Sequence, residues 1–230
     1  MDEKGVAKYF RQTKLLLYVA TGLIAGGLLS YLVLVKLCHI REFYQITLLC
    51  AVAGVVVLIC FFAVRTRDDS IDGYAASKYA DVEDLLKKTA EQSGQKPNYI
   101  GSYSSFGYAL KNPDRVNFRF GNDNIPRTEK TEGGAVILTP DTVYTLVRKC
   151  DLITGESDDS TAAIPVSSVT GASVADSGFT ANDSGRERYC DYTELRITYD
   201  GGEVSFAVHK DSLADEAAER INRLAERSRA

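Results

Sequence analysis

This sequence has little histidine and none of the common catalytic motifs. Histidine occurs only twice, as His39 and His209, and neither has a nucleophile at a recognisable spacing. The patterns GxSxG, GxxxxGK(S/T), GxGxxG and HExxH are all missing. These absences exclude the common signatures of serine hydrolases, P-loop NTPases, dinucleotide-dependent enzymes and zinc proteases. The sequence therefore predicts no catalytic residue, no cofactor and a non-enzymatic protein.

Metal-ligand spacing is also missing. The five cysteines form no CxxC pair and no cysteine–histidine cluster. The acidic residues within 151–159 lack the spacing of a calcium-binding EF-hand loop. No metal site is predicted. Cys150 and Cys190 lie in the polar part of the chain, where a reducing cytoplasm keeps them as thiols, whereas the opposite location allows a bridge between them.

Charged residues are missing from two long apolar runs. Residues 15–35 and 43–64 contain no Asp, Glu, Lys, Arg or His, and each run is long enough to cross the roughly 30 Å hydrocarbon core of a bilayer as a helix. A cleavable signal peptide does not fit the first run, because its apolar core is too long and a second run follows directly. The sequence predicts a transmembrane hairpin without the buried charges of a transporter.

Basic residues predict the orientation of this hairpin. Six Lys or Arg residues flank the outer ends of the two runs, namely Lys4, Lys8, Arg11, Lys14, Arg65 and Arg67, whereas the connecting loop has only Lys36 and Arg41. The bias places both chain ends in the cytoplasm, at a bacterial cytoplasmic membrane. Residues 66–230 carry a net charge of −8, with 20 basic and 28 acidic residues, which argues against nucleic acid as a partner.

Small residues mark one face of the first run. Gly22 and Gly26 form a small-xxx-small pair, which lets another helix approach closely. We expect this pair to pack against Cys50 and Gly54 of the second run. A homodimer through Gly22 and Gly26 is the alternative.

The polar part of the chain begins with a helical signal. After a 1–14 cytoplasmic tail and the hairpin at 15–64, residues 65–97 read as a linker to Gly73 and a juxtamembrane amphipathic helix of about five turns. The apolar positions Tyr79, Val82, Leu86 and Ala90 recur at three- and four-residue intervals. The polar face of this helix is mixed rather than basic, so we expect it to pack on the following domain rather than on lipid.

Residues 98–230 alternate in the manner of short strands and end in one helix. The clearest element is a hairpin in which Leu195 and Ile197 alternate with polar residues, 200–203 turn, and Val204 and Phe206 alternate back. The last segment carries an apolar stripe, for which the sequence indicates Leu213, Ala217, Ile221 and Leu224. The predicted class is α+β: a hairpin of transmembrane helices, then a small antiparallel barrel or sandwich capped by a carboxy-terminal helix.

This order of elements resembles the bacterial pleckstrin-homology-like domains, which are related in shape to the GRAM domain. The resemblance is carried by GGAVILTPDTVYTLV at 133–147, IPVSSVTGASV at 164–174, LRITYDGGEVSFAV at 195–208 and LADEAAERINRLAE from Leu213. It covers about 100 residues and has no sharp motif. In such bacterial proteins the domain often accompanies two transmembrane helices.

The resemblance and the composition together favour a membrane-tethered module that presents its domain to a protein or peptide partner, as a scaffold or accessory subunit. One alternative is a recogniser of anionic lipid head groups at the inner leaflet, through basic residues between 111 and 130: Lys111, Arg115, Arg119, Arg127 and Lys130. Another is an enzyme acting on a membrane-proximal substrate through residues without a motif.

One tetrapeptide resembles a catalytic loop of a different class of protein. Thr154-Gly155-Glu156-Ser157 reads TGES, which resembles the actuator-domain loop of P-type cation ATPases. That loop works with a DKTGT aspartate and six or more spans, and both are missing here. We interpret TGES as a turn, with the polar residues 158–160 forming a loop before the next strand.

Overall fold

The computed structural model describes residues 2–11, 15–37, 43–92, 98–109, 117–183, 186–208 and 212–229. The chain divides into two compact units. One, the hairpin unit, comprises residues 11–67, and the other, the globular unit, comprises residues 1–10 together with 68–230.

The hairpin unit consists of helices that are long and apolar enough to span a membrane. Its elements are α2 (Leu15–Ser30), which continues as a π-helical stretch (Tyr31–Leu37), and α3 (Tyr44–Val64). Most of their apolar side chains are exposed, as shown by Leu29 at 63% and Leu49 at 71%. The apolar runs therefore form two paired helices, as predicted.

The glycines that bring α2 and α3 together differ from the predicted pair. A Cβ atom on Gly27 would lie 2.9 Å from the carbonyl oxygen of Thr47, and one on Gly54 would lie 2.9 Å from that of Ala20. Gly22 and Gly26 have nothing within 4 Å of the corresponding position. The expected contact of Gly22 and Gly26 with the second helix is therefore wrong, because one residue rotates a helix by about 100° and places Gly27 on the contact face. The expected contribution of Gly54 is confirmed.

The globular unit begins with helices α1 (Glu3–Arg11), α4 (Asp68–Ser77) and α5 (Val82–Gln92). The predicted linker to Gly73 and single long helix are wrong in detail, because α4 starts at Asp68 and a turn at 78–81 separates it from α5. The expected 1–14 tail likewise contains α1, whose Val6 and Tyr9 are fully buried.

The globular unit contains three antiparallel sheets. The four-stranded sheet has the order β1-β4-β5-β6, the three-stranded sheet has the order β7-β8-β9, and β2 pairs with β3. Their strands are β1 (Gly101–Tyr108), β2 (Phe118–Phe120), β3 (Pro126–Thr128), β4 (Lys130–Leu138), β5 (Thr142–Asp151), β6 (Ser157–Pro165), β7 (Val169–Asp183), β8 (Arg186–Tyr199) and β9 (Gly202–Val208). Among the described residues no sheet closes on itself, so the α+β class is confirmed without a closed barrel.

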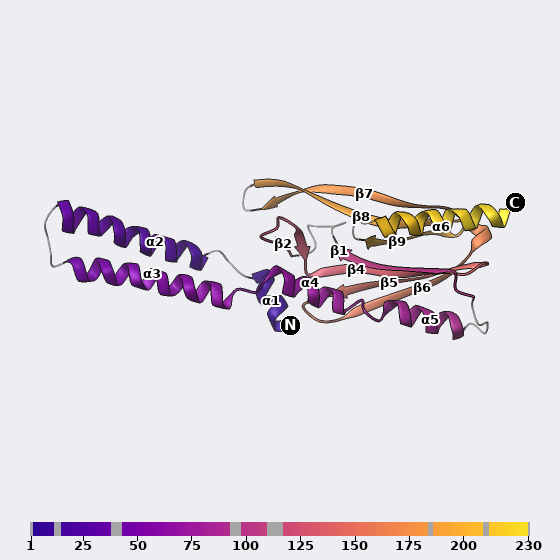
Figure 1. Cartoon of the computed structure of the whole chain (residues 1–230), viewed down its shortest axis with the longest axis horizontal. Helices are drawn as coiled ribbons and strands as arrows, with labels where there is room; N and C mark the ends of the chain where they lie inside the picture. The colour runs from indigo at the N-terminus through magenta and orange to yellow at the C-terminus, as the bar shows by residue number, and fades with distance from the viewer. Residues whose placement is uncertain are drawn as a thin grey trace. The chain divides into compact units, whose positions relative to one another are not determined.

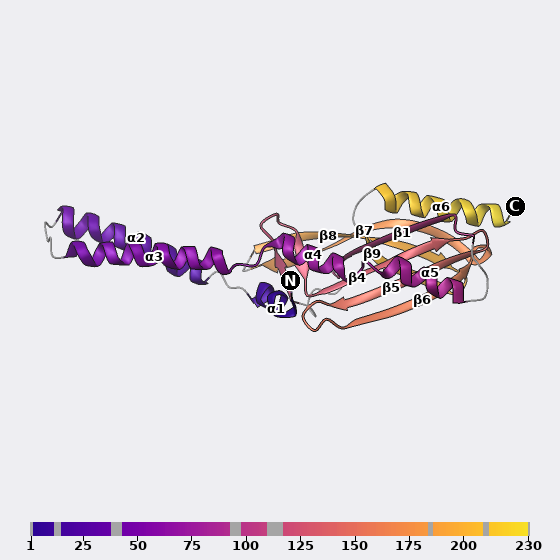
Figure 2. The ribbon, with the colours of Figure 1, turned by 60° about the horizontal axis from the view of Figure 1, so that its bottom comes forward.

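The main core lies between the two larger sheets and helix α6 (Ser212–Arg229). Val136 of β4, Phe206 of β9 and Ile221 of α6 are buried together in it. A second cluster lies under α5, where Leu86 packs with Ile137 on the opposite face of the four-stranded sheet. Figures 1 and 2 show α5 and α6 on different sides of the sheets. The packing of the amphipathic helix on the following domain is thus as predicted.

The β8–β9 hairpin is also confirmed. Leu195 pairs with Phe206 and Ile197 with Val204, and the turn contains Gly202 at a φ of 139°, a backbone conformation that favours glycine.

Strand β6 ends at Pro165, a 3-10 turn follows at Val166–Ser168, and β7 starts at Val169. One loop prediction in this region needs correction. The acidic residues Asp158 and Asp159 lie within β6 rather than in a loop. Because β6 is the outermost strand of its sheet and is mostly exposed, its polar sequence is that of an edge strand.

Candidate binding groove

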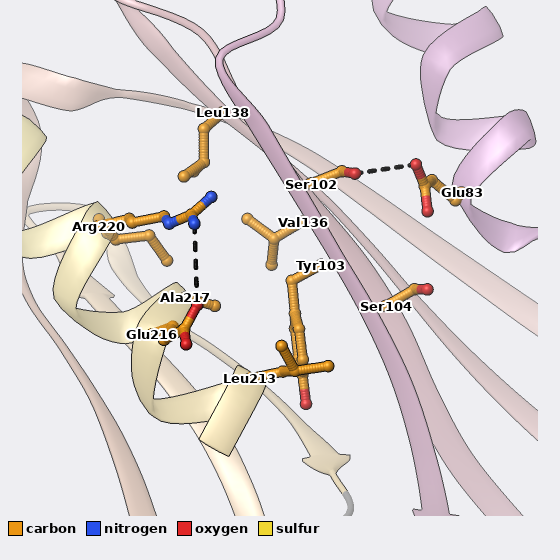
Figure 3. Close-up of a pocket in the computed structure, with 11 residues that line it drawn as sticks. Glu83, Ser102, Tyr103, Ser104, Val136, Leu138, Leu213, Glu216, Ala217 and Arg220 are labelled. Atoms are coloured by element: carbon orange, nitrogen blue, oxygen red, sulfur yellow. Dashed lines mark hydrogen bonds and ion pairs between the residues drawn. The ribbon is translucent and has the colours of Figure 1, made fainter. Parts of the chain in front are cut away.

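A groove of the globular unit runs along β1 between α5 and α6, and we call it the α5–β1–α6 groove (Figure 3). Its cavity measures about 290 Å³. Glu83 comes from α5, Ser102 and Ser104 from β1, and Leu213 and Arg220 from α6. The groove therefore joins three segments that are far apart in the sequence.

The groove exists because β1 is the outermost strand of its sheet and carries small side chains there. Ser102 and Ser104 point away from the core, and larger side chains at these two positions would fill the groove. On the α6 side, Ala217 takes the place that a larger core residue would occupy. Small residues on both sides thus keep the space between the two helices open.

The α5 wall of the groove is polar and ionised. The Ser102 hydroxyl donates a hydrogen bond of 2.9 Å to Glu83, and the ammonium group of Lys87 lies 2.8 Å from the same carboxylate. The hydrogen bond from Lys87, followed by that from Ser102, lowers the pKa of Glu83. A fixed carboxylate therefore marks this wall at neutral pH.

The floor is apolar, whereas the α6 wall combines the apolar Leu213 and Ala217 with the charged Glu216 and Arg220. Val136, Leu138 and Ile221 belong to the main core and form the floor. Leu213 stands above them and is 57% exposed. Of the predicted buried stripe of α6, Ala217 and Ile221 are confirmed and Leu224 is half-buried against the core, whereas the placement of Leu213 is wrong. The other buried residues of α6 are Ala214, Ala218 and Ala225. Burying small alanines brings α6 close to the sheet and turns Leu213 outward.

A second cavity, of about 320 Å³, continues the groove along α6. It shares Leu138 and Arg220 with the first and adds Ile100, which is 45% exposed. Arg223 and Arg227 line it on the α6 side. Arg220 lies 3.7 Å from Glu216 and Arg223 lies 2.8 Å from Glu219, both as exposed pairs that solvent screens strongly. A row of guanidinium groups therefore borders an apolar channel.

The chemistry available at the groove is that of apolar side chains and guanidinium groups. The described part of the chain has no group of three or more His, Cys, Asp or Glu residues that could hold a metal ion. Cys150 is buried under α5, and burial raises its pKa, so it is a poor nucleophile. An apolar channel with arginines on its rim fits an extended segment that carries apolar side chains and carboxylates.

Two of the five basic residues expected to hold lipid head groups, Arg119 and Arg127, make contacts within the globular unit. Lys111 and Arg115 lie outside the described residues. Arg127 is buried and bonds to Asp72 and Asp123, while Arg119 donates a 2.7 Å hydrogen bond to the carbonyl oxygen of Tyr9. Both of these arginines are therefore occupied by contacts within the globular unit.

The TGES segment is a turn between β5 and β6, as predicted. The carboxylate of Asp151 accepts hydrogen bonds from the backbone N–H groups of Ile153 and Thr154, and Gly155 has a φ of 74°. This is the geometry of an Asp-initiated turn that needs a residue tolerant of positive φ. The two histidines, His39 and His209, lie outside the described residues.

Sequence reasoning did not find the groove. Its lining residues come from positions near 83, 102, 136 and 213–221, and no local pattern connects them. The one available signal was that Leu213 is a large apolar residue placed one position before the alanines of the buried stripe. No family model matches this chain, and neither the curated proteins nor the solved structures contain a match.

Proposed function

We propose that this protein is a membrane-tethered interaction module whose globular unit binds a protein or peptide partner in the α5–β1–α6 groove. The observation that carries the proposal is the exposed apolar channel in which Leu213 and Ile100 stand beside Arg220. These are two of the four large apolar side chains that are exposed among the described residues of the globular unit, the others being Ile125 and Tyr189. Clustered exposed apolar surface favours a partner more than scattered residues do.

The membrane tether is supported by the surroundings of α2 and α3. Both helices are apolar on all sides, yet only a few of their residues, such as Ala20, Gly27 and Gly54, are buried. An all-apolar helix that has no protein around it fits a lipid environment. Residues 1–10 and 68–230 form one unit, which supports a hairpin that enters and leaves the membrane on the same side. The basic bias favours the cytoplasmic side of a bacterial membrane.

The pleckstrin-homology-like resemblance is part of this proposal. The resemblance implies about seven short antiparallel strands followed by one helix, and the described strands followed by α6 are in keeping with that order. This order supports a sandwich of the same general kind. Function is argued from the groove rather than from the fold, because one fold can serve many functions.

Recognition of anionic lipid head groups is the second candidate, and one observation favours it. Arg220, Arg223 and Arg227 recur on one face of α6 and border the second cavity. Guanidinium groups in a row can bind phosphates as well as carboxylates. The apolar floor beneath them gives a peptide the advantage.

A peptide selection tests the proposal. The full chain in detergent is used to select from a random peptide library, and enriched peptides are measured against wild type, Leu213→Asp and a matched control, Ile125→Asp, which changes an equally exposed residue outside the groove. We expect enriched peptides to combine apolar and acidic residues and to lose about tenfold or more in affinity for Leu213→Asp only.

Two results would oppose this outcome. Equal binding to both variants would place the peptide site elsewhere. No enrichment, together with thermal stabilisation by short-chain phosphatidylglycerol but not phosphatidylcholine, would favour lipid recognition instead.

A further inference from the structure

We propose that the globular unit rests on the lipid surface through one end, formed by the β2–β3 turn with Ile125 and by Tyr189 of β8. This inference rests on the membrane tether proposed above and adds a second contact with the bilayer. We call this surface the membrane-proximal end.

The β2–β3 turn holds an apolar side chain outward. Ile125 is 51% exposed, although turn positions usually carry polar residues. Its N–H donates a 3.0 Å hydrogen bond to the Asp123 carboxylate, and its carbonyl oxygen accepts one of 3.0 Å from the N–H of Gly121. Asn124 between them has a φ of 61°. These bonds fix the turn, so Ile125 cannot fold back into the core without breaking them.

The same turn is bonded to the residue at which the chain returns from the hairpin unit. The N–H of Asn122 donates a 2.8 Å hydrogen bond to Asp68, and the hydroxyl of Tyr9 donates a 2.9 Å bond to the same carboxylate. Only three residues separate Asp68 from Val64, the last residue of α3. Four residue steps reach at most about 14 Å when fully extended. The length of the chain alone therefore limits the distance from Asp68 to the end of α3 to about 14 Å.

Strand β8 contacts this turn through the side chain of Arg188. The guanidinium group of Arg188 donates a 2.9 Å hydrogen bond to the side chain of Asn124 and lies 4.8 Å from the centre of the Phe120 ring. The next residue, Tyr189, is 70% exposed, the most of the large apolar side chains of the globular unit. Figures 1 and 2 both show the free end of the β7–β8 hairpin at the same end of the globular unit as β2, α1 and α4.

The chemistry of this end suits the interfacial region of a bilayer. Tyrosine is enriched there because its ring is apolar and its hydroxyl reaches water, and an isoleucine gains by leaving water. The nearby charges are mixed, and Asp123 is already neutralised by Arg127. We therefore expect contact with bilayers of any head group and little sensitivity to salt, which differs from head-group recognition.

The absence of tryptophan from the chain makes a direct test available. Single tryptophans are introduced as Ile125→Trp and Tyr189→Trp in the full-length protein, reconstituted into phosphatidylcholine vesicles with and without brominated acyl chains. Both positions are exposed, so the variants are expected to fold, which circular dichroism checks. We expect at least about twofold quenching by brominated lipid and a shift of the emission to shorter wavelength.

Two reporters calibrate the result. Val55→Trp, on an exposed face of α3, should be quenched more strongly, and Ser228→Trp, near the carboxy-terminal end of α6 at the opposite end of the globular unit, should not be quenched. If Val55→Trp is quenched while Ile125→Trp and Tyr189→Trp match Ser228→Trp, the lipid contact is overturned but the tether stands. If Val55→Trp is not quenched, the tether and this inference both fail.

Discussion

Arg127 shows how far a residue's role can differ from what its neighbours in the sequence suggest. Its side chain is 2% exposed and reaches Asp72 of α4 at 2.6 Å and Asp123 of the β2–β3 turn at 2.7 Å. The hydroxyl of Tyr108 donates a further hydrogen bond to Asp72. Asp72 is 55 residues away in the sequence, so a basic residue that looked free for a phosphate is instead the centre of an ion cluster. A buried guanidinium needs such carboxylates to offset its lost hydration.

This cluster predicts a pH dependence. The hydrogen bond from Arg127 lowers the pKa of Asp123 from 3.8 to about 2. Because the pKa is lower in the folded state, the stabilisation is present above about pH 4 and is lost as the pH falls toward about pH 2. For the full chain in detergent, we expect the urea midpoint to fall in this window. Asp123→Asn should lower the midpoint at about pH 5 and flatten the further fall.

The control for this measurement is Asp158→Asn. Asp158 is exposed on β6 and contacts no arginine among the described residues. This variant should follow the wild-type curve. A pH profile of Asp123→Asn that parallels wild type would show that the Arg127 cluster contributes nothing to stability.

At the scale of elements, the sequence predicted the helices and strands whose own residues carry a clear apolar run or alternation. The apolar runs gave α2 and α3, and strict alternation around a glycine turn gave β8 and β9. Elements shaped by tertiary context were missed. Helix α4 has only Ile71 and Ala75 buried, and edge strand β6 buries only Ile164. The α5–β1–α6 groove depends on how α5, β1 and α6 pack against one another, and no residue pattern within any one of these elements predicts that packing.

Two leucines on amphipathic helices, one buried and one exposed, should differ in their contribution to stability. Leu86 of α5 is 1% exposed and packs under the four-stranded sheet, whereas Leu213 of α6 is 57% exposed. Leu86→Ala should lower the free energy of unfolding by about 2–5 kcal/mol, through lost transfer energy and the cavity left behind. Leu213→Ala should change it by less than about 0.5 kcal/mol, as is usual for exposed sites. Urea titration followed by circular dichroism measures both.

The Leu213→Ala result distinguishes the observed orientation of α6, in which Leu213 is exposed, from the predicted one, in which Leu213 is buried. A large loss of stability in Leu213→Ala would restore the stripe that the sequence indicated and would remove the apolar wall of the α5–β1–α6 groove. A small loss in Leu86→Ala would detach α5 from the core of the globular unit.

At the scale of the whole molecule, the chain leaves the globular unit after α1 and returns to it at α4. Tyr9 of α1 and Asp68 of α4 are hydrogen-bonded to each other, so the residues before the first span and after the second are held in one folded body. A hairpin whose two ends are joined in this way has to place both on the same side of a bilayer. The basic residues at these ends predict that this side is the cytoplasmic one.

Accessibility of two thiols tests this topology. Cys38 lies in the sequence between the two apolar runs, and Ser104→Cys places a thiol on the exposed face of β1. Each thiol is tested in its own chain, in which all other cysteines are replaced by serine or alanine. In intact cells that express the protein in a bacterial cytoplasmic membrane, a membrane-impermeant maleimide should label Cys38 but should label Ser104→Cys only after lysis. The opposite pattern would put the globular unit outside, where Cys150 and Cys190 meet oxidising conditions. Labelling of both sites in intact cells would mean that the runs do not span the membrane, because only a spanning hairpin separates its loop from its ends.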